Sequence, residues 1–337
     1  MDVNKNEFLL PNMIKGKVDT NNQEIFRYSI TTSDVLIART SETIKEIAYS
    51  SCLLENIANC TYSGFLLKAS PKIKNIIFPP YIVLLLRSQI YRKRLMKLST
   101  ETSRALINSD NLAKLIINIS KFKEQKKIWL FFNLLLKKIT ITEQKIETLK
   151  KYKEGLISRG LKLIIGNNKF VKFKSLFEEY NVKNEEDFLP YTVGKYGLKQ
   201  IQDFNYSISN HKVFKPNSLL IGLGIEEIAF STKTTGSVSP VYNVYSLKSC
   251  CDDSFVDIFL KPLLWIKKAF ITKKSTRREF EIDKKALENM KIPYLNSNEI
   301  KYLCYSIKKV DKLIETLMDK KDKLDLCKKY LLEAMFI

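Results

Sequence analysis

The chain has 337 residues, which is long for a single hydrophobic core and favours two domains with a connector. Hydrophobic residues make up 45% of it, which excludes an intrinsically disordered chain. Lysine and arginine number 57 against 36 aspartates and glutamates, and the formal net charge of +21 predicts a polyanionic partner, either nucleic acid or an anionic membrane surface. Charge alone leaves a solvated basic surface as the alternative.

The first segment, residues 1–120, is expected to mix short strands with helices. Asp34–Ala38 and Tyr62–Leu67 have the composition of strands. Two prolines at positions 79 and 80 punctuate the chain, and Tyr81–Leu98 then has helical spacing with many basic residues. The segment closes on the polar, basic loop Ser99–Ala105.

A long helix is expected next, over residues 121–162. Its apolar residues recur at alternating intervals of three and four, which is typical of a coiled-coil seam. The seam positions are Gln125, Ile128, Phe132, Leu135, Ile139, Thr142, Ile146, Leu149, Lys153 and Leu156.

The second segment, residues 163–294, repeats the plan of the first. Its strand candidates are Ser218–Ile221, Ile228–Phe230 and Val238–Tyr245, and Phe255–Thr272 has helical spacing. A polar, basic loop, Lys273–Arg278, again closes the segment, so the duplication includes the globular parts as well as the helices.

A second long helix is expected over residues 295–337, with the same spacing as the first. Its seam reads Ile300, Leu303, Ile307, Val310, Ile314, Leu317, Lys321, Leu324, Lys328 and Leu331. An internal repeat of this kind predicts an α+β fold with two similar globular domains separated by the two helices. We expect antiparallel pairing, because Lys153 and Lys328 hold matching positions and would face each other in a parallel pair.

Candidates for catalysis are weak. The single histidine, His211, lies in a predicted loop and is interpreted as a surface residue, and no spacing of His, Cys, Asp and Glu suits a metal. The pair Gly222 and Gly224 lacks the third glycine of a dinucleotide fingerprint. Phe78 precedes Pro-Pro-Tyr where an amino-methyltransferase needs an acceptor side chain. The six cysteines include no CxxC pair and are expected to be reduced, as in a cytoplasmic protein.

Basic clusters at matching places in both halves are the stronger signal, since arginine recognises guanine, lysine neutralises phosphate and hydroxyl groups bond to either. A solvated face is the alternative for any single cluster. The candidate DNA-binding residues are Arg39, Thr40, Ser41, Arg87, Arg92, Arg94, Arg104, Lys233, Lys273, Lys274, Arg277 and Arg278.

Several motifs resemble the specificity subunit of type I restriction-modification enzymes. The segment from Asp34 to Thr43 resembles the family's "GD-[IV]-L-x-x-R-T-S-E-T", and Gly236–Tyr242 resembles "G-x-V-S-P-x-Y". Glu124–Ile128 and Leu149–Leu156 resemble the beginning and the end of the family's conserved helix. The matches extend over nearly the whole chain in the family's order.

The resemblance implies two target-recognition domains, residues 1–120 and 163–294, each recognising half of a split DNA site. The helices, 121–162 and 295–337, would set the gap and dock methyltransferase subunits, and through them a restriction subunit. It implies a non-catalytic, cytoplasmic protein with no membrane association and no cofactor, S-adenosylmethionine being expected on the methyltransferase. The first domain is expected to be shortened at its N-terminus. A coiled-coil scaffold with incidental charge and an enzyme acting on nucleic acid are the alternatives.

Overall fold

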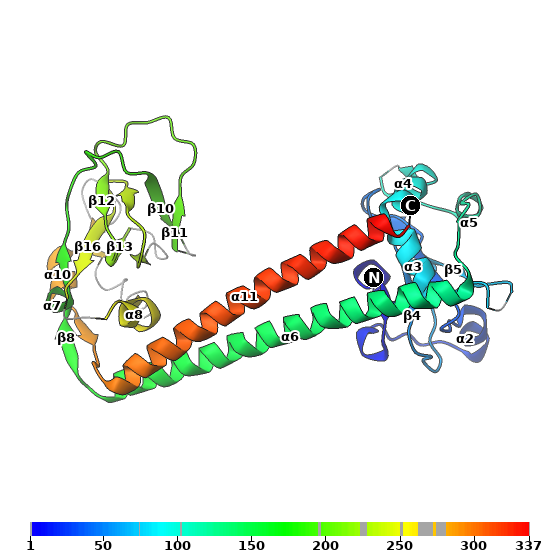
Figure 1. The fold of residues 1–337 in the computed structure, drawn as a ribbon, viewed down its shortest axis with the longest axis horizontal. Helices are drawn as coiled ribbons and strands as arrows, with labels where there is room; N and C mark the ends of the chain where they lie inside the picture. Colours follow the sequence, from blue (N-terminus) through cyan, green and yellow to red (C-terminus); the bar gives the residue numbers. More distant parts are fainter. Residues whose placement is uncertain are drawn as a thin grey trace. The chain divides into compact units, whose positions relative to one another are not determined.

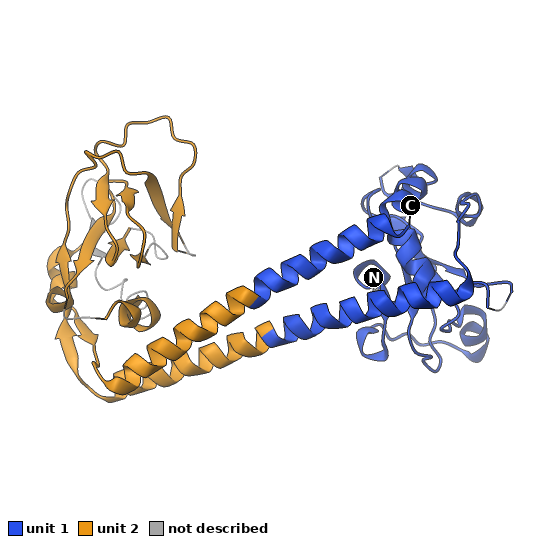
Figure 2. Cartoon of the chain, in the orientation of Figure 1, with its two compact units in different colours: residues 1–145, 317–337 blue, residues 146–316 orange. Residues whose placement is uncertain are grey.

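The computed structural model describes residues 2–73, 75–101, 103–194, 197–222, 228–249, 252–261, 272–273 and 281–336. Their contacts divide the chain into two compact units (Figure 2). Unit 1 comprises residues 1–145 and 317–337, and unit 2 comprises residues 146–316. Two long helices, α6 (Phe122–Gly166) and α11 (Asn298–Ala334), contribute residues to both units.

Helices α6 and α11 pack against each other in opposite directions (Figure 1). Ion pairs between them define the register, because residue numbers rise along α6 while they fall along α11. These pairs are Glu143–Lys321 at 3.3 Å, Lys153–Asp311 at 2.6 Å and Arg159–Glu299 at 2.8 Å. The predicted antiparallel pairing is therefore confirmed.

The predicted seams are the contact faces of the two helices. Every seam position of α6 and of α11 is buried or half-buried. Each of the three seam lysines is paired with a carboxylate. Lys153 pairs with Asp311, Lys321 with Glu143 and Asp325, and Lys328 with Glu7, with Nζ–Oε2 2.9 Å in the last pair. Half-exposed ion pairs contribute about 1 kcal/mol at most to stability. Burial of the apolar seam positions therefore stabilises the helix pair, and the lysine ion pairs fix its register.

Unit 1 is built on a mixed four-stranded sheet of order β1-β4-β2-β5, in which β1 and β4 are parallel and the other neighbours antiparallel. The strands are β1 (Phe8–Leu9), β2 (Val35–Ala38), β4 (Ser50–Leu53) and β5 (Leu66–Ala69). Its short helices are α1 (Asp2–Lys5), η1 (Pro11–Met13), α2 (Asn22–Tyr28), α3 (Pro79–Arg87), α4 (Gln89–Lys97) and α5 (Ser109–Ala113).

The core of unit 1 joins this sheet to the long helices. Residues 79–86 of α3 are all buried, and the cluster that they form includes Phe132 of α6 and Phe336 after α11. The ring of Phe336 lies 5.5 Å from that of Tyr81 and 6.5 Å from that of Phe132, centroid to centroid. The two ends of the sequence of unit 1 are thus held by one core.

Unit 2 contains an antiparallel sheet of order β14-β13-β16-β9 and a second sheet of order β11-β10-β15-β12. The strands are β9 (Phe177–Glu179), β10 (Pro190–Gly194), β11 (Gly197–Gln200), β12 (Lys212–Phe214), β13 (Ser218–Ile221), β14 (Ile228–Ser231), β15 (Gly236–Val238) and β16 (Asn243–Leu247). Strand β8 (Phe170–Lys172) pairs with β19 (Lys291–Pro293). The helices are α7 (Phe173–Leu176), α8 (Asp253–Phe255), η2 (Val256–Leu260) and α10 (Lys284–Asn289).

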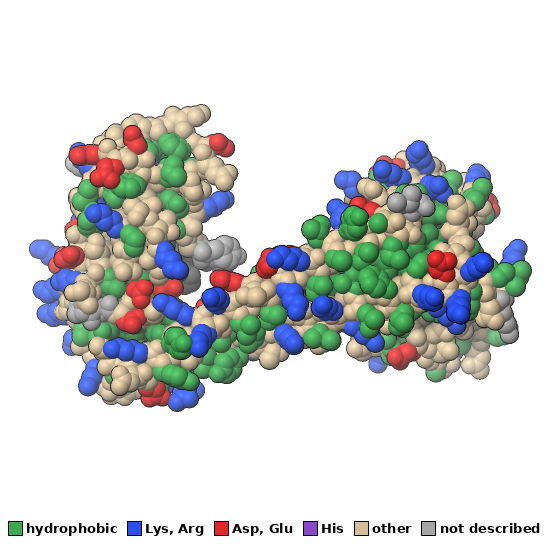
Figure 3. Space-filling view, in the orientation of Figure 1, with side chains coloured by type: hydrophobic (Ala, Val, Ile, Leu, Met, Phe, Trp, Pro, Cys, Tyr) green, Lys and Arg blue, Asp and Glu red, His purple; other side chains and the backbone are tan. Residues whose placement is uncertain are grey.

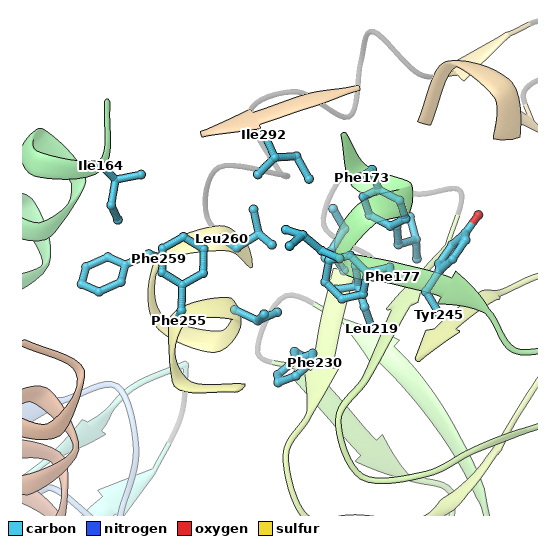
Figure 4. Packing of buried hydrophobic residues seen from close by; sticks show 14 of the residues in the cluster. Ile164, Phe173, Phe177, Leu219, Phe230, Tyr245, Phe255, Phe259, Leu260 and Ile292 are labelled. Atoms are coloured by element: carbon cyan, nitrogen blue, oxygen red, sulfur yellow. The ribbon is translucent and has the colours of Figure 1, made fainter. Parts of the chain in front are cut away.

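An aromatic core fills the space between the main sheet of unit 2 and its helices (Figure 4). The rings of Phe173 and Phe177 are stacked with centroids 4.7 Å apart, and Tyr245 meets Phe173 edge to face at 5.1 Å. Phe259 of η2 and Ile164 of α6 belong to the same cluster. The C-terminal part of α6 is therefore anchored in unit 2 by burial of apolar side chains.

The internal repeat is visible in the sheets of the two units. In unit 1, β2 lies between β4 and β5, and in unit 2, β13 lies between β14 and β16, with every pairing antiparallel. This common three-stranded arrangement supports the α+β fold with an internal pseudo-repeat that the sequence predicts.

Two predicted elements are interrupted. The helix expected over Tyr81–Leu98 is two helices, because Ser88 is extended (φ −65°, ψ 152°) and donates its hydroxyl to the Leu85 carbonyl. The strand expected over Val238–Tyr245 is also wrong as one element, since the amide of Tyr242 donates to the carbonyl of Ser239 and closes a turn containing Pro240. Most of the helix expected over Phe255–Thr272 lies outside the described residues.

Two glycines of α6 should respond in opposite directions to alanine. A methyl group at Gly160 would overlap the ring of buried Phe259, whereas nothing lies within 4 Å of one at Gly155. Gly160→Ala should destabilise unit 2 by about 1–3 kcal/mol through overpacking. Gly155→Ala should stabilise the chain by about 0.5–1 kcal/mol, because alanine loses less backbone entropy in a helix. Urea unfolding of both variants measures this, and a stable Gly160→Ala variant would contradict the packing of α6 against η2.

Candidate nucleic-acid interface

A small sheet in unit 1 brings together two basic segments that are far apart in the sequence. Strand β7 (Ala105–Leu106) pairs with β3 (Thr40–Ser41) on one side and with β6 (Thr100–Glu101) on the other. The amide of Ile107 also donates to the carbonyl of Arg39 over 3.0 Å. The structure therefore places Arg39 and Thr40 beside the hairpin β6–β7 that carries Arg104.

The base of this hairpin is fixed and its basic side chains are exposed. Ala105 and Ile107 are fully buried in the core of unit 1, and Ser41 is buried as well. Arg39 and Arg104 are exposed, and Thr40 is half-buried. Arg39 immediately precedes β3 and Arg104 immediately precedes β7, so both exposed arginines adjoin paired strands, where each can present a bidentate fork to a base edge or a phosphate.

An exposed aromatic residue that sequence reasoning missed lies next to Arg39. The amide of Arg39 donates to the carbonyl of Phe65 over 2.9 Å, and the Phe65 side chain is 57% exposed. Exposed aromatic rings beside arginines are used to stack on bases or to wedge between them. The sequence carries one hint of this, since Phe65 follows Gly64 in the turn that precedes β5, which the Leu66 amide closes by donating to the Ser63 carbonyl.

Unit 2 has a hairpin at the corresponding place in the chain. Strand β17 (Thr272–Lys273) pairs antiparallel with β18 (Glu281–Ile282). Lys273 is in β17, while Lys274, Arg277 and Arg278 lie outside the described residues. The first basic loop is therefore described by the structure, whereas most of the second lies outside the described residues.

Lys233 is exposed in the turn between β14 and β15. The Ser231 hydroxyl donates to the Thr234 carbonyl over 2.6 Å and closes this turn. A turn therefore holds the backbone around Lys233. No strand pairing in the described part of the chain connects this turn to β17 or β18.

Three other candidate arginines have their guanidinium groups engaged within unit 1. Arg87 donates Nε to the Ser50 carbonyl at 2.9 Å and Nη2 to the Val3 carbonyl at 3.1 Å, and Arg92 donates Nη2 to the Lys45 carbonyl. Both are half-buried. Arg94 is exposed, lies over the Tyr91 ring and reaches the Ile116 carbonyl at 3.4 Å. Arg87 and Arg92 are therefore built into the fold of unit 1, which their sequence positions do not reveal.

His211 is not the surface residue that its sequence position predicts. It is buried at 6% exposure, with Nδ1 3.4 Å from the Ser237 hydroxyl, and burial lowers its pKa. Among the described residues, no group of three or more His, Cys, Asp or Glu side chains could hold a metal ion. Cys52, Cys60, Cys304 and Cys327 are free thiols.

The stability of unit 2 should fall in mild acid because of His211. Above pH about 6.5 the imidazole is neutral in both the folded and the unfolded chain and contributes nothing. As the pH falls below that value the unfolded chain binds the proton first, because the folded pKa is lower, so stability is lost. His211→Asn should remove this part of the pH dependence. The urea unfolding midpoints of both proteins, measured from pH 7.5 to 5, test this. If the midpoint depends on pH equally in both proteins, His211 is not buried in the folded chain.

None of the helices in the described part of the chain combines the length and the apolarity that crossing a bilayer requires. Apolar side chains are nevertheless exposed on the long helices, where Figure 3 shows them gathered along the part that belongs to unit 1. The exposed residues are Leu130, Phe131, Leu134, Ile141, Met318, Leu326 and Tyr330 in unit 1 and Tyr152, Ile165, Tyr302, Tyr305 and Leu313 in unit 2. Trp129 instead packs on Phe8, with centroids 4.5 Å apart, and Leu136 packs against the core of unit 1.

Comparison with known proteins agrees with this architecture. Residues 3–151 match the family described as the type I restriction modification DNA specificity domain. The fold is similar to that of the S subunit of a type I restriction-modification system from M. genitalium, with a TM-score of 0.57 and 15% identity over 92% of this chain and 84% of that one. It is also similar to the HsdS subunit from Thermoanaerobacter tengcongensis, with a TM-score of 0.53 and 14% identity over 90% and 80% of the chains.

Proposed function

We propose that this chain, whose residues 3–151 match the type I restriction modification DNA specificity domain, is a specificity subunit of that family and binds double-stranded DNA at a site divided into two parts. The globular parts within residues 1–120 and 163–294 would each be a target-recognition domain and recognise one part. In this proposal the chain performs no chemistry itself and carries no cofactor. Methyltransferase subunits supply S-adenosylmethionine chemistry, and a restriction subunit joins through them, in the cytoplasm.

The observation that carries the proposal is the juxtaposition of Arg39, Thr40 and Arg104 through the β3–β7–β6 sheet. Two exposed arginines next to paired strands, with exposed Phe65 beside one of them, combine groups that bond to base edges with a ring that can stack. The hairpin β17–β18 supplies an equivalent position in unit 2, with Lys273, Lys274, Arg277 and Arg278 as its DNA-binding candidates. The net charge of +21 favours the approach of both to DNA.

Binding of the purified chain to random and selected duplexes across a salt series tests the proposal. The logarithm of the binding constant should fall linearly with the logarithm of the salt concentration, with a slope of about −0.9 for each phosphate contacted. Enrichment of a split sequence from a random pool would support two recognition domains. A coiled-coil scaffold with incidental charge would bind weakly, with no enriched sequence, and an enzyme acting on nucleic acid would alter the duplex during the assay.

The exposed apolar residues of the long helices are the proposed docking surface for methyltransferase subunits. A contiguous exposed apolar face is costly in water and usually marks an interface. Met318 is 48% exposed and Leu326 68% exposed, and both lie on α11 within unit 1. Neither belongs to the seam that pairs with α6, so they are available to a partner.

Met318→Glu combined with Leu326→Glu should weaken methyltransferase binding by about tenfold or more, because each change places a charge in an apolar contact. Duplex binding by the isolated chain should remain unchanged. Lys323→Glu, an exposed position between them on α11, controls for added negative charge. Surface plasmon resonance with the purified methyltransferase measures the affinity. Normal partner binding by the double variant would remove this surface from the proposal.

A further inference from the structure

Arg87 and Arg92 flank the same aromatic ring in a pocket of unit 1 that lies outside the β3–β7–β6 sheet. The guanidinium carbon of Arg87 lies 4.8 Å from the centroid of Tyr49, and that of Arg92 lies 4.7 Å from it. The pocket has a volume of about 470 Å³, which is the size of a small-molecule site. Its remaining polar lining is Glu7, Lys45, Gln89 and Lys93.

The charges in this pocket are unbalanced. Four cationic side chains, Lys45, Arg87, Arg92 and Lys93, line it with one carboxylate, Glu7. Both oxygens of Glu7 accept from Lys328, at 3.0 and 2.9 Å. In the described part of the chain, no carboxylate lies within ion-pair distance of any of the four. Glu7 still favours the charged form of Arg87 from a distance, but it cannot neutralise the group.

One guanidinium nitrogen in the pocket has no partner. Arg92 donates Nη2 to the Lys45 carbonyl, but its Nη1 is buried and has no hydrogen-bond acceptor among the described residues. An unmade hydrogen bond on a charged, buried donor costs more than one on a neutral group. Burial, reinforced by the neighbouring charge of Arg87, lowers the pKa of Arg92 to about 10 although Tyr49 opposes the shift. An anion in the pocket would balance the charge that the buried guanidinium group retains.

We propose that the pocket formed by Tyr49, Arg87, Arg92, Lys45 and Lys93 binds a phosphate group. A phosphate offers the several acceptor oxygens and the double negative charge that two guanidinium groups and two flexible ammonium groups can match. The group is carried either by a free phosphorylated small molecule or by a DNA backbone that reaches this side of unit 1. The site goes beyond the proposed recognition of DNA bases and does not depend on it.

Isothermal titration of the full chain with sodium pyrophosphate tests this site, with sodium sulfate at equal ionic strength as the comparison. Pyrophosphate should bind at one site per chain and more tightly than sulfate. Lys45→Gln with Lys93→Gln should weaken it by about tenfold or more, since two charge-assisted contacts are lost. Both lysines are exposed, so the variant should fold normally. Lys97→Gln, exposed on the same helix α4 but outside the pocket, should bind as the unmodified chain does.

The same titration with the chain saturated by duplex DNA identifies the source of the phosphate. If DNA excludes pyrophosphate, the backbone supplies the group, and if both bind together, a free phosphorylated molecule does. Absence of binding, or equal affinity in the double variant and the unmodified chain, would overturn the proposal. Pyrophosphate binding is first measured without DNA, so its result does not depend on whether the proposed DNA recognition is correct.

Discussion

Replacing Arg39 and Arg104 together with alanine should abolish most of the sequence preference of unit 1 for its part of the DNA site. An arginine that bonds to a base edge is worth about 1–3 kcal/mol, so two of them correspond to a loss of about 30-fold or more in specific affinity. Both side chains are exposed and neither makes a hydrogen bond to the protein through its guanidinium group among the described contacts, so folding should be unaffected.

Lysine replacements separate the two ways in which these arginines can contact DNA. Arg39→Lys with Arg104→Lys keeps the charge but loses the bidentate fork. If the arginines recognise bases, this variant should lose specificity and keep its affinity for random duplex. If they contact phosphates, it should bind nearly as the unmodified chain does. Arg159→Ala, which removes an exposed arginine on α6 in unit 2, controls for total charge. Unchanged specificity in the double alanine variant would exclude this sheet as the recognition surface.

Gln125→Glu should be the most damaging isosteric change in unit 1. Gln125 is fully buried at the beginning of α6 and uses its whole amide. Its Oε1 accepts from the Phe78 amide, and its Nε2 donates to the carbonyls of Ile76 and Ser120, each at 2.8 Å. A carboxylate would turn the two donations into repulsion between oxygens, and each carbonyl left without a donor in this part-buried site costs up to about 1–3 kcal/mol.

The effect of Gln125→Glu should depend on pH in a defined direction. A carboxyl group buried against two carbonyls has a folded pKa above its unfolded value of about 4.3. The variant is therefore least impaired below that pH, where the protonated acid can donate to one carbonyl, and loses stability as the pH rises through the folded pKa.

Urea unfolding at pH 4 and pH 7 in a Trp265→Phe background, where Trp129 reports on unit 1, measures this. Gln23→Glu on exposed α2 is the matched control. Equal stability of both variants would contradict the buried hydrogen bonds of Gln125.

The pairing of the long helices could be predicted from the sequence because it depends on local periodicity. A spacing of three and four residues places one apolar stripe on each helix, and burial of that stripe needs only a partner with the same period. The lysines in the seams were also informative, because a charge inside an apolar seam is stable only beside a compensating carboxylate. Asp311 and Glu7 supply it, but their identity depends on the register and on the fold of the N-terminus, which periodicity does not define.

The roles of the individual arginines could not be predicted, because their partners are distant in the sequence. Arg87 and Arg104 look alike in the sequence, since each is a basic residue next to an apolar one, Leu86 and Ala105 respectively. Arg87 becomes part of the core edge because the carbonyls of Val3 and Ser50 converge on it. Arg104 stays exposed because the β6–β7 turn projects from the buried Ala105. Similarly, the location of His211 inside unit 2 follows from the packing of Tyr206 and Ser237, which nothing in the local sequence indicates.

The central proposal is that this chain selects the DNA sequence at which a partner methyltransferase acts. Genome-wide mapping of methylated bases, in cells that co-express the chain with its methyltransferase subunit, tests it most directly. The unmodified chain should produce methylation at one split sequence, and Arg39→Ala with Arg104→Ala should lose or relax one part of that sequence while the other part stays the same. Methylation that is independent of the chain, or an unchanged split sequence in the variant, would contradict the account.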